Sequence, residues 1–124
     1  MAGIRLGRVQ HQIMKVLWKR GRATAREITE SLAGRDGAPV HSTVQTLLRK
    51  LEAKGVVGHE VRERTFTFLP LVTESDAARF ALRDLIGRVF NGSPSGMVAY
   101  LVKHEKLTRK ELDEIKKAIE EARS

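Results

Sequence analysis

The sequence predicts a mainly α-helical chain with one small β-hairpin, and three observations support this fold class. Apolar residues recur every three or four positions over six stretches, which is the period of an amphipathic helix. Between the third and fourth stretches, residues 65–68 alternate polar and apolar, as a half-buried strand does. Glycines, prolines and helix-capping patterns separate the stretches, so the ends of each element can be placed as well.

The chain begins with two short predicted helices. The first covers residues 8–20 and ends at Gly21. Its apolar stripe consists of Val9, Ile13, Val16 and Leu17, broadened by Met14 and Trp18. The second begins with a capping box, in which the Thr24 hydroxyl accepts from the Glu27 amide and the Glu27 carboxylate reaches back. A cluster of helix breakers at residues 33–39 predicts a turn after it.

The third predicted helix covers residues 41–54 and is closed by Gly55. Its apolar stripe consists of Val44, Leu47, Leu48 and Leu51. The outer face and its flanks are polar and basic, and they carry Ser42, Thr43, Gln45, Thr46, Arg49 and Lys50. Hydroxyls, amides and guanidinium groups read base edges and bind phosphates. The alternative is an ordinary solvated helix face, and this stretch alone does not decide between the two.

A β-hairpin follows the third helix. Residues 57–61 and 65–68 predict its strands, and we expect Phe66 and Phe68 to pack inward. The tip between the strands is charged and consists of Arg62, Glu63 and Arg64. Three short helices followed by such a hairpin form a winged helix-turn-helix. The basic tip would be the wing, which contacts the phosphate backbone beside the groove that receives the third helix.

The remaining chain is predicted to be helical. A cap at residues 73–76 begins a fourth helix that runs to about Phe90, residues 91–94 break the pattern, and a fifth helix starts near Ser95. A second capping box at residues 108–111 begins a sixth. Three helices make a small core with wide apolar stripes. We expect a second copy to cover a seam of Leu82, Leu85, Val89, Met97 and Leu101. The alternative is that these helices pack against the first domain.

The positive charge of the chain is concentrated in the first of two predicted domains. Residues 1–72 hold 13 Lys and Arg against 6 Asp and Glu, a net charge of +7, whereas residues 73–124 hold 10 against 9. A basic region joined to a balanced one is typical of a polyanion-binding module with an appended region. We therefore expect a winged-helix DNA-binding domain at 1–72 and a helical dimerisation domain at 73–124.

Several classes of protein are excluded or disfavoured by what the sequence lacks. It has no cysteine, so it holds neither a disulfide framework nor a thiolate metal site. No apolar run is long enough to span a bilayer, and the first residues do not form a signal peptide, so we expect a cytoplasmic protein without a membrane partner. No complete metalloprotease motif or phosphate-binding glycine loop occurs. We therefore expect no enzyme activity, no metal and no cofactor.

The order of these features is similar to that of a known family. The stretches that carry the similarity are residues 13–18, 24–28, 42–51 with Lys54-Gly55, 66–68 with Pro70, 71–76, 89–93 and 107–112. Together they resemble the penicillinase-repressor family of winged-helix transcriptional repressors, over residues from about 6 to 119. Each stretch is a weak signal by itself, but in this order the stretches are specific.

The resemblance implies a homodimeric repressor that binds palindromic operator DNA, with contacts at Ser42, Thr43, Gln45 and Thr46. Some relatives carry Arg at the position of Gln45, and Gln prefers adenine edges where Arg prefers guanine. Antibiotic-responsive relatives are cleaved at an Asn-Phe bond, which implies a regulatory protease as a partner, and the matching bond here is Tyr100-Leu101. Copper-responsive relatives carry a cysteine cluster that this chain lacks.

A second hypothesis is a winged helix that serves as a protein-interaction or RNA-binding module without operator specificity. Fold alone does not separate these functions. An RNA binder is expected to expose stacking aromatic side chains. This chain has few aromatic residues, and most lie at positions of the apolar stripes. A pure protein-interaction domain does not need a net charge of +7 over 72 residues. Both features favour duplex DNA as the partner.

Overall fold

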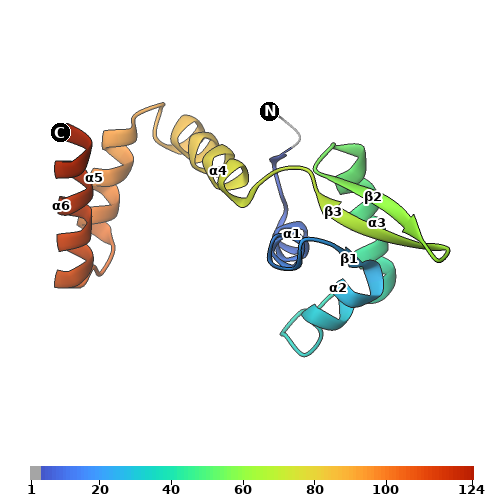
Figure 1. Ribbon diagram of the computed structural model, residues 1–124. Helices are drawn as coiled ribbons and strands as arrows, with labels where there is room; N and C mark the ends of the chain where they lie inside the picture. The colour runs from blue at the N-terminus through green and yellow to red at the C-terminus, as the bar shows by residue number, and fades with distance from the viewer. Residues whose placement is uncertain (1–3) are drawn as a thin grey trace. The chain divides into compact units, whose positions relative to one another are not determined.

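The computed structural model describes residues 4–124 and confirms the predicted fold class (Figure 1). Every predicted helix is present, as is the predicted hairpin. The elements are α1 (Arg8–Arg20), β1 (Ala23–Thr24), α2 (Ala25–Leu32), α3 (His41–Ala53), β2 (Val57–Arg62), β3 (Thr65–Pro70), α4 (Glu74–Val89), α5 (Pro94–His104) and α6 (Arg109–Arg123).

The first three helices and the strands share one apolar core, as a winged helix requires. Each of α1, α2 and α3 buries one face, and the base of the hairpin closes the remaining side. The largest fully buried side chains are Ile13, Met14, Leu17, Ile28, Leu32, Val44, Leu48, Leu51, Val56 and Val57. All of these positions except Val56 and Val57 lie in helical stripes that the sequence pattern predicts. Burial of this set fixes which face of α3 remains outside.

The sheet has three antiparallel strands in the order β1-β3-β2, one more than the predicted hairpin. The additional strand β1 pairs Ala23 with Phe68 and Thr24 with Thr67. Two residues are too few to show an alternating pattern, so β1 cannot be recognised from the sequence. Its effect is to tie the start of α2 to the central strand of the sheet.

The expectation that Phe66 and Phe68 both pack inward is wrong for Phe66. Phe68 is 7% exposed and belongs to the core, whereas Phe66 is 48% exposed. Both residues lie on one face of β3, as alternation requires, but the helical core extends only beneath the base of the hairpin. Phe66 lies nearer the tip, opposite Val61, and its side chain lies outside the core.

The wing turns through two residues that both adopt the left-handed backbone region. Glu63 has a φ of 49° and Arg64 a φ of 66°. A two-residue hairpin turn favours this geometry because its twist matches that of the strands. Neither residue is the Asn or Gly that such turns usually carry, so two charged side chains occupy the tip. The turn therefore holds Arg64 at the end of the wing.

The capping box of α2 is formed as predicted. The Glu27 amide donates to the Thr24 hydroxyl at 3.1 Å, and the Thr24 amide donates to the Glu27 carboxylate at 2.8 Å. The hydrogen bond from the Thr24 backbone holds the pKa of Glu27 below its ordinary value. Since Thr24 also belongs to β1, the cap joins the first turn of α2 to the sheet.

Replacing Thr24 with Ala should lower the free energy of unfolding by about 1 kcal/mol, because the first turn of α2 loses a side-chain acceptor. Denaturant titration at neutral pH measures this change. Ser31→Ala, an exposed position of the same helix, is the matched control and should leave stability within about 0.5 kcal/mol of wild type. Equal stability of Thr24→Ala and wild type would contradict the role of the cap.

The chain divides into two compact units, and the division lies between Arg83 and Asp84, within α4. The first turns of α4 are attached to the winged helix: the Trp18 indole N–H donates to the Val72 carbonyl at 2.9 Å, and Lys15 pairs with Glu74 at 3.1 Å. The domain boundary between residues 72 and 73 stays a prediction.

The three C-terminal helices, α4 to α6, have few buried side chains. Neither α5 nor α6 has a buried residue, and in α4 only Ala77 is buried. The predicted seam is largely exposed: Leu82, Leu85, Val89 and Leu101 are exposed, and Met97 is half-buried. The Tyr100-Leu101 bond lies within α5, and both side chains are exposed. Its cleavage by a protease stays a prediction.

Candidate nucleic-acid interface

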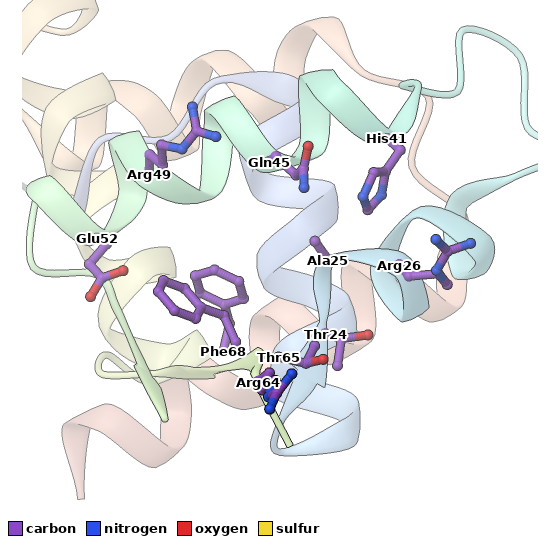
Figure 2. Close-up of a pocket in the computed structure, with 11 residues that line it drawn as sticks. Thr24, Ala25, Arg26, His41, Gln45, Arg49, Glu52, Arg64, Thr65 and Phe68 are labelled. Atoms are coloured by element: carbon purple, nitrogen blue, oxygen red, sulfur yellow. The ribbon is translucent and has the colours of Figure 1, made fainter. Parts of the chain in front are cut away.

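A hollow of about 590 Å³ lies between α3, the start of α2 and the wing (Figure 2). Its wall on α3 consists of His41, Gln45, Arg49 and Glu52, which follow one another at helical spacing. Its opposite wall consists of Thr24, Ala25, Arg26, Arg64, Thr65, Phe66 and Phe68. Three segments that are separate in the sequence therefore enclose one concave surface with both polar and aromatic walls.

Three of the predicted site residues meet around this hollow. Gln45 and Arg49 reach it from α3, and Arg64 reaches it from the wing tip. All three are exposed, and no hydrogen bond or ion pair involving their side chains occurs in the part of the chain that the structure describes. An amide with two donors and an acceptor, flanked by two guanidinium groups, can bind a polyanion and distinguish base edges.

The other predicted residues of α3 lie outside the hollow. Ser42, Thr43, Thr46 and Lys50 are all exposed. The Thr46 hydroxyl donates to the Ser42 carbonyl at 3.0 Å, so its donor is already used, although its oxygen can still accept. The polar face of α3 is thus divided in two. One part faces the wing, and the other faces away from the core without a neighbouring element.

Arg62 is placed differently from Arg64. It lies across from Thr65 at the end of the hairpin and pairs with Glu60 at 3.4 Å. Glu60 also pairs with Arg22 at 3.0 Å. This network lies on the opposite face of the sheet from Phe66 and Phe68, because successive residues of a strand point to opposite faces. The two arginines of the tip therefore serve different surfaces.

Arg26, His41 and Glu52 also line the hollow. No pattern in the sequence singles out Arg26 or Glu52, and for His41 the sequence favours an ordinary surface position over a cap or a phosphate contact. The His41 imidazole lies 3.3 Å from the Thr29 hydroxyl, which holds the ring at the start of α3. Arg26 lies in the first turn of α2, where the capping box suggested only a local structural role. No signal in the sequence joins them, because the hollow exists only after α2, α3 and the wing are assembled.

Other kinds of site are not seen. Residues 4–124 contain no cluster of three or more His, Asp or Glu side chains that could hold a metal ion. Nor does any helix within that range combine the length and the apolar character needed to cross a membrane. The concave surface between α3 and the wing brings together three of the predicted site residues, Gln45, Arg49 and Arg64.

Comparison with known proteins decides the family. The model of a family described as penicillinase repressor matches residues 6–121. The chain belongs to the penicillinase repressor family. The similarity covers both units of the structure, so the family relationship extends to the C-terminal helices as well as to the winged helix.

Curated relatives agree with this assignment. The chain is 28% identical over 110 residues to the penicillinase repressor of Bacillus licheniformis, covering 89% of this chain and 85% of that protein. It is 28% identical over 106 residues to the methicillin resistance regulatory protein MecI of Mammaliicoccus sciuri, covering 85% of each chain. The relatives are thus regulators of similar length.

A solved structure supports the fold of the first unit. The chain is similar to the DNA-binding domain of the repressor BlaI, solved in solution, with a TM-score of 0.51 and 29% sequence identity. The match covers 58% of this chain and 87% of that domain. The winged helix seen here is therefore the fold of a DNA-binding domain in this family.

Proposed function

We propose that the chain is a homodimeric transcriptional repressor that binds palindromic operator DNA. The observation that carries this proposal is the concave surface between α3 and the wing, where Gln45, Arg49 and Arg64 meet without partners in the described chain. Membership of a repressor family supports it. A winged helix places such a helix in the major groove and its wing on the neighbouring backbone.

Within this interface we assign different roles to different side chains. Gln45 and Thr43 read base edges from α3, because an amide and a hydroxyl distinguish donors from acceptors. Arg49, Lys50, Arg62 and Arg64 neutralise phosphates, as do most basic side chains in protein–DNA interfaces. Ser42 and Thr46 add polar contacts on the outer part of α3. The contacts to phosphate orient the helix, and the contacts to bases select the sequence.

The homodimer is supported by the exposed apolar side chains of the C-terminal helices. Large apolar residues without cover are costly in water, and a patch of them usually marks an interface. The exposed ones in α4 to α6 are Leu82, Leu85, Val89, Val98, Tyr100, Leu101, Val102, Leu112 and Ile119. Two copies joined there would present two α3 helices to one face of a duplex, one turn or a multiple of it apart.

Duplex selection tests the proposal directly. The full chain is incubated with a random pool of duplexes, and the bound sequences are determined. Two half-sites related by a dyad, with salt-sensitive affinity for the selected duplex, are expected. A scrambled duplex and an RNA of the same sequence are the controls. Equal affinity for all three would favour the alternative of a binding module without operator specificity.

Replacing Arg64 with Ala should weaken binding to all duplexes alike and lower the slope of log affinity against log salt by about one. The reason is that the variant lacks a contact to phosphate, and such a contact does not depend on the base sequence. Titration of selected and scrambled duplexes at several salt concentrations measures both quantities. Arg62→Ala, whose side chain already pairs with Glu60, is the matched comparison and should have the smaller effect.

A further inference from the structure

A hydrogen bond joins α3 to strand β2 of the hairpin. The His59 Nδ1 atom on β2 lies 2.7 Å from Oε2 and 2.9 Å from Oε1 of Glu52 on α3. Because a carboxylate only accepts, Nδ1 carries the proton and donates to Glu52. Among residues 4–124 this is the only side-chain hydrogen bond between α3 and the hairpin. Both side chains are partly shielded from water.

The same imidazole is held by the aromatic side chains of β3. Its ring stacks on Phe66 with the centroids 3.9 Å apart and the planes 9° from parallel. Phe68 lies 6.0 Å from the ring on the side of the core. Phe66 and Phe68 in turn contact each other edge to face at 6.1 Å. His59 therefore contacts α3 through its nitrogen and β3 through its ring.

The outer half of the hairpin has two further attachments, the Arg22–Glu60 ion pair at 3.0 Å and the pairing of Thr24 with Thr67, and neither connects it to α3. The buried residues of the hairpin are Val57 and Phe68, which join the core, and Thr67, which lies opposite Glu60. Toward the tip, Val61 is 62% exposed and Phe66 is 48% exposed, so neither anchors the wing by burial. A two-stranded ribbon without a packed face is marginally stable. Because those attachments lead to Arg22 and β1, the distance between α3 and the outer half of the hairpin depends on the contacts that His59 makes.

We propose that Glu52, His59 and Phe66 form a clamp that fixes the wing at the distance from α3 at which Arg64 meets the DNA backbone. Glu52 is then a positioning residue that does not itself contact DNA. The inference rests on the proposed function for its consequence in DNA binding. The clamp itself is a property of the free protein and can be measured without DNA.

The charge of Glu52 makes the proposal testable. Repulsion of phosphate and positioning of the wing predict opposite changes in DNA affinity when Glu52 is replaced. The carboxylate lines a hollow that would receive a phosphate backbone, so by charge alone its removal should strengthen binding. If Glu52 holds the wing, its removal should weaken binding instead. Glu52→Ala removes both the charge and the acceptor, whereas Glu52→Gln removes the charge and keeps an amide oxygen that can accept from His59.

Hydrogen exchange of the free full-length chain tests the clamp. Backbone amides of residues 60–65 should exchange at least about five times faster in Glu52→Ala than in wild type, while those of α1 and α3 should not change. His59→Phe keeps an aromatic ring against Phe66 but loses the donor, and it should also accelerate exchange. Glu30→Ala removes an exposed acid outside the hollow and is the control. Unchanged exchange at residues 60–65 in Glu52→Ala would overturn the clamp.

Duplex titration tests the consequence. Glu52→Ala should bind all duplexes about five- to tenfold more weakly, and Glu52→Gln should recover most of that loss. In a double-mutant cycle, Arg64→Ala should cost less than about twofold in the Glu52→Ala background, because the wing is already displaced. Tighter binding by both Glu52 variants, or additive effects in the cycle, would overturn the positioning role. If the wild-type chain bound no duplex, the proposed function would be wrong. Hydrogen exchange at residues 60–65 would still show whether Glu52 and His59 hold the hairpin.

Discussion

Replacing Leu85 with Asp should convert the full chain into a monomer and weaken operator binding by roughly 10²–10⁴-fold. A single winged helix makes few phosphate contacts, so affinity depends on joining two of them. Once one half-site is bound, the dimer makes the second contact intramolecular, which multiplies affinity without new contacts. Sedimentation gives the oligomeric state, and titration of a palindromic duplex gives the affinity.

The structure explains the choice of Leu85 and supplies a control. Leu85 is 43% exposed in the single chain and lies in the middle of the predicted seam of α4. An unpaired carboxylate there is costly to bury against a second copy. Gly87 is exposed on the opposite side of the same helix, and an added Cβ meets no atom within 4 Å. Gly87→Asp adds the same charge and should remain dimeric. If the Leu85→Asp variant stayed dimeric and bound the palindromic duplex as tightly as wild type, the predicted seam would be wrong.

Replacing Gln45 with Ala should cost about 1–3 kcal/mol against the preferred duplex and remove the base preference at one position of each half-site. Gln45 lines the hollow and makes no hydrogen bond within the described chain, so its amide is available to a base. Titration against duplexes that vary at a single position measures both effects. A variant with the affinity and the preference of wild type would show that α3 is not the reader in this register.

The substitution Gln45→Arg extends this test. An amide makes two hydrogen bonds to adenine, whereas a guanidinium makes two to guanine. The preferred base at the affected position should therefore change from adenine to guanine, while the rest of the selected site stays the same. Gln12→Arg on α1 introduces the same side chain at a distance from the hollow and should leave the selected sequence unchanged.

The helical elements were predictable because each has a local cause. The stripe from Val44 to Leu51 has the helical period, and the Thr24 capping box and Gly21 mark helix ends through contacts within a few residues. The hairpin was predictable from alternation, but the burial of its residues was not. Phe66 and Phe68 have the same local pattern, and only the extent of the core separates the buried one from the exposed one.

Local patterns in the sequence specify the helices, the basic charge of the first region and the polar face of α3. These depend on period, composition and neighbours along the chain, which the order of residues contains. Packing of separate segments places Gln45, Arg49 and Arg64 around one hollow, pairs Arg22 with Glu60, and brings Glu52 to His59. Each of these contacts joins segments that are separate in the sequence. They arise when the core fixes the positions of α3 and the hairpin, and no local pattern specifies them.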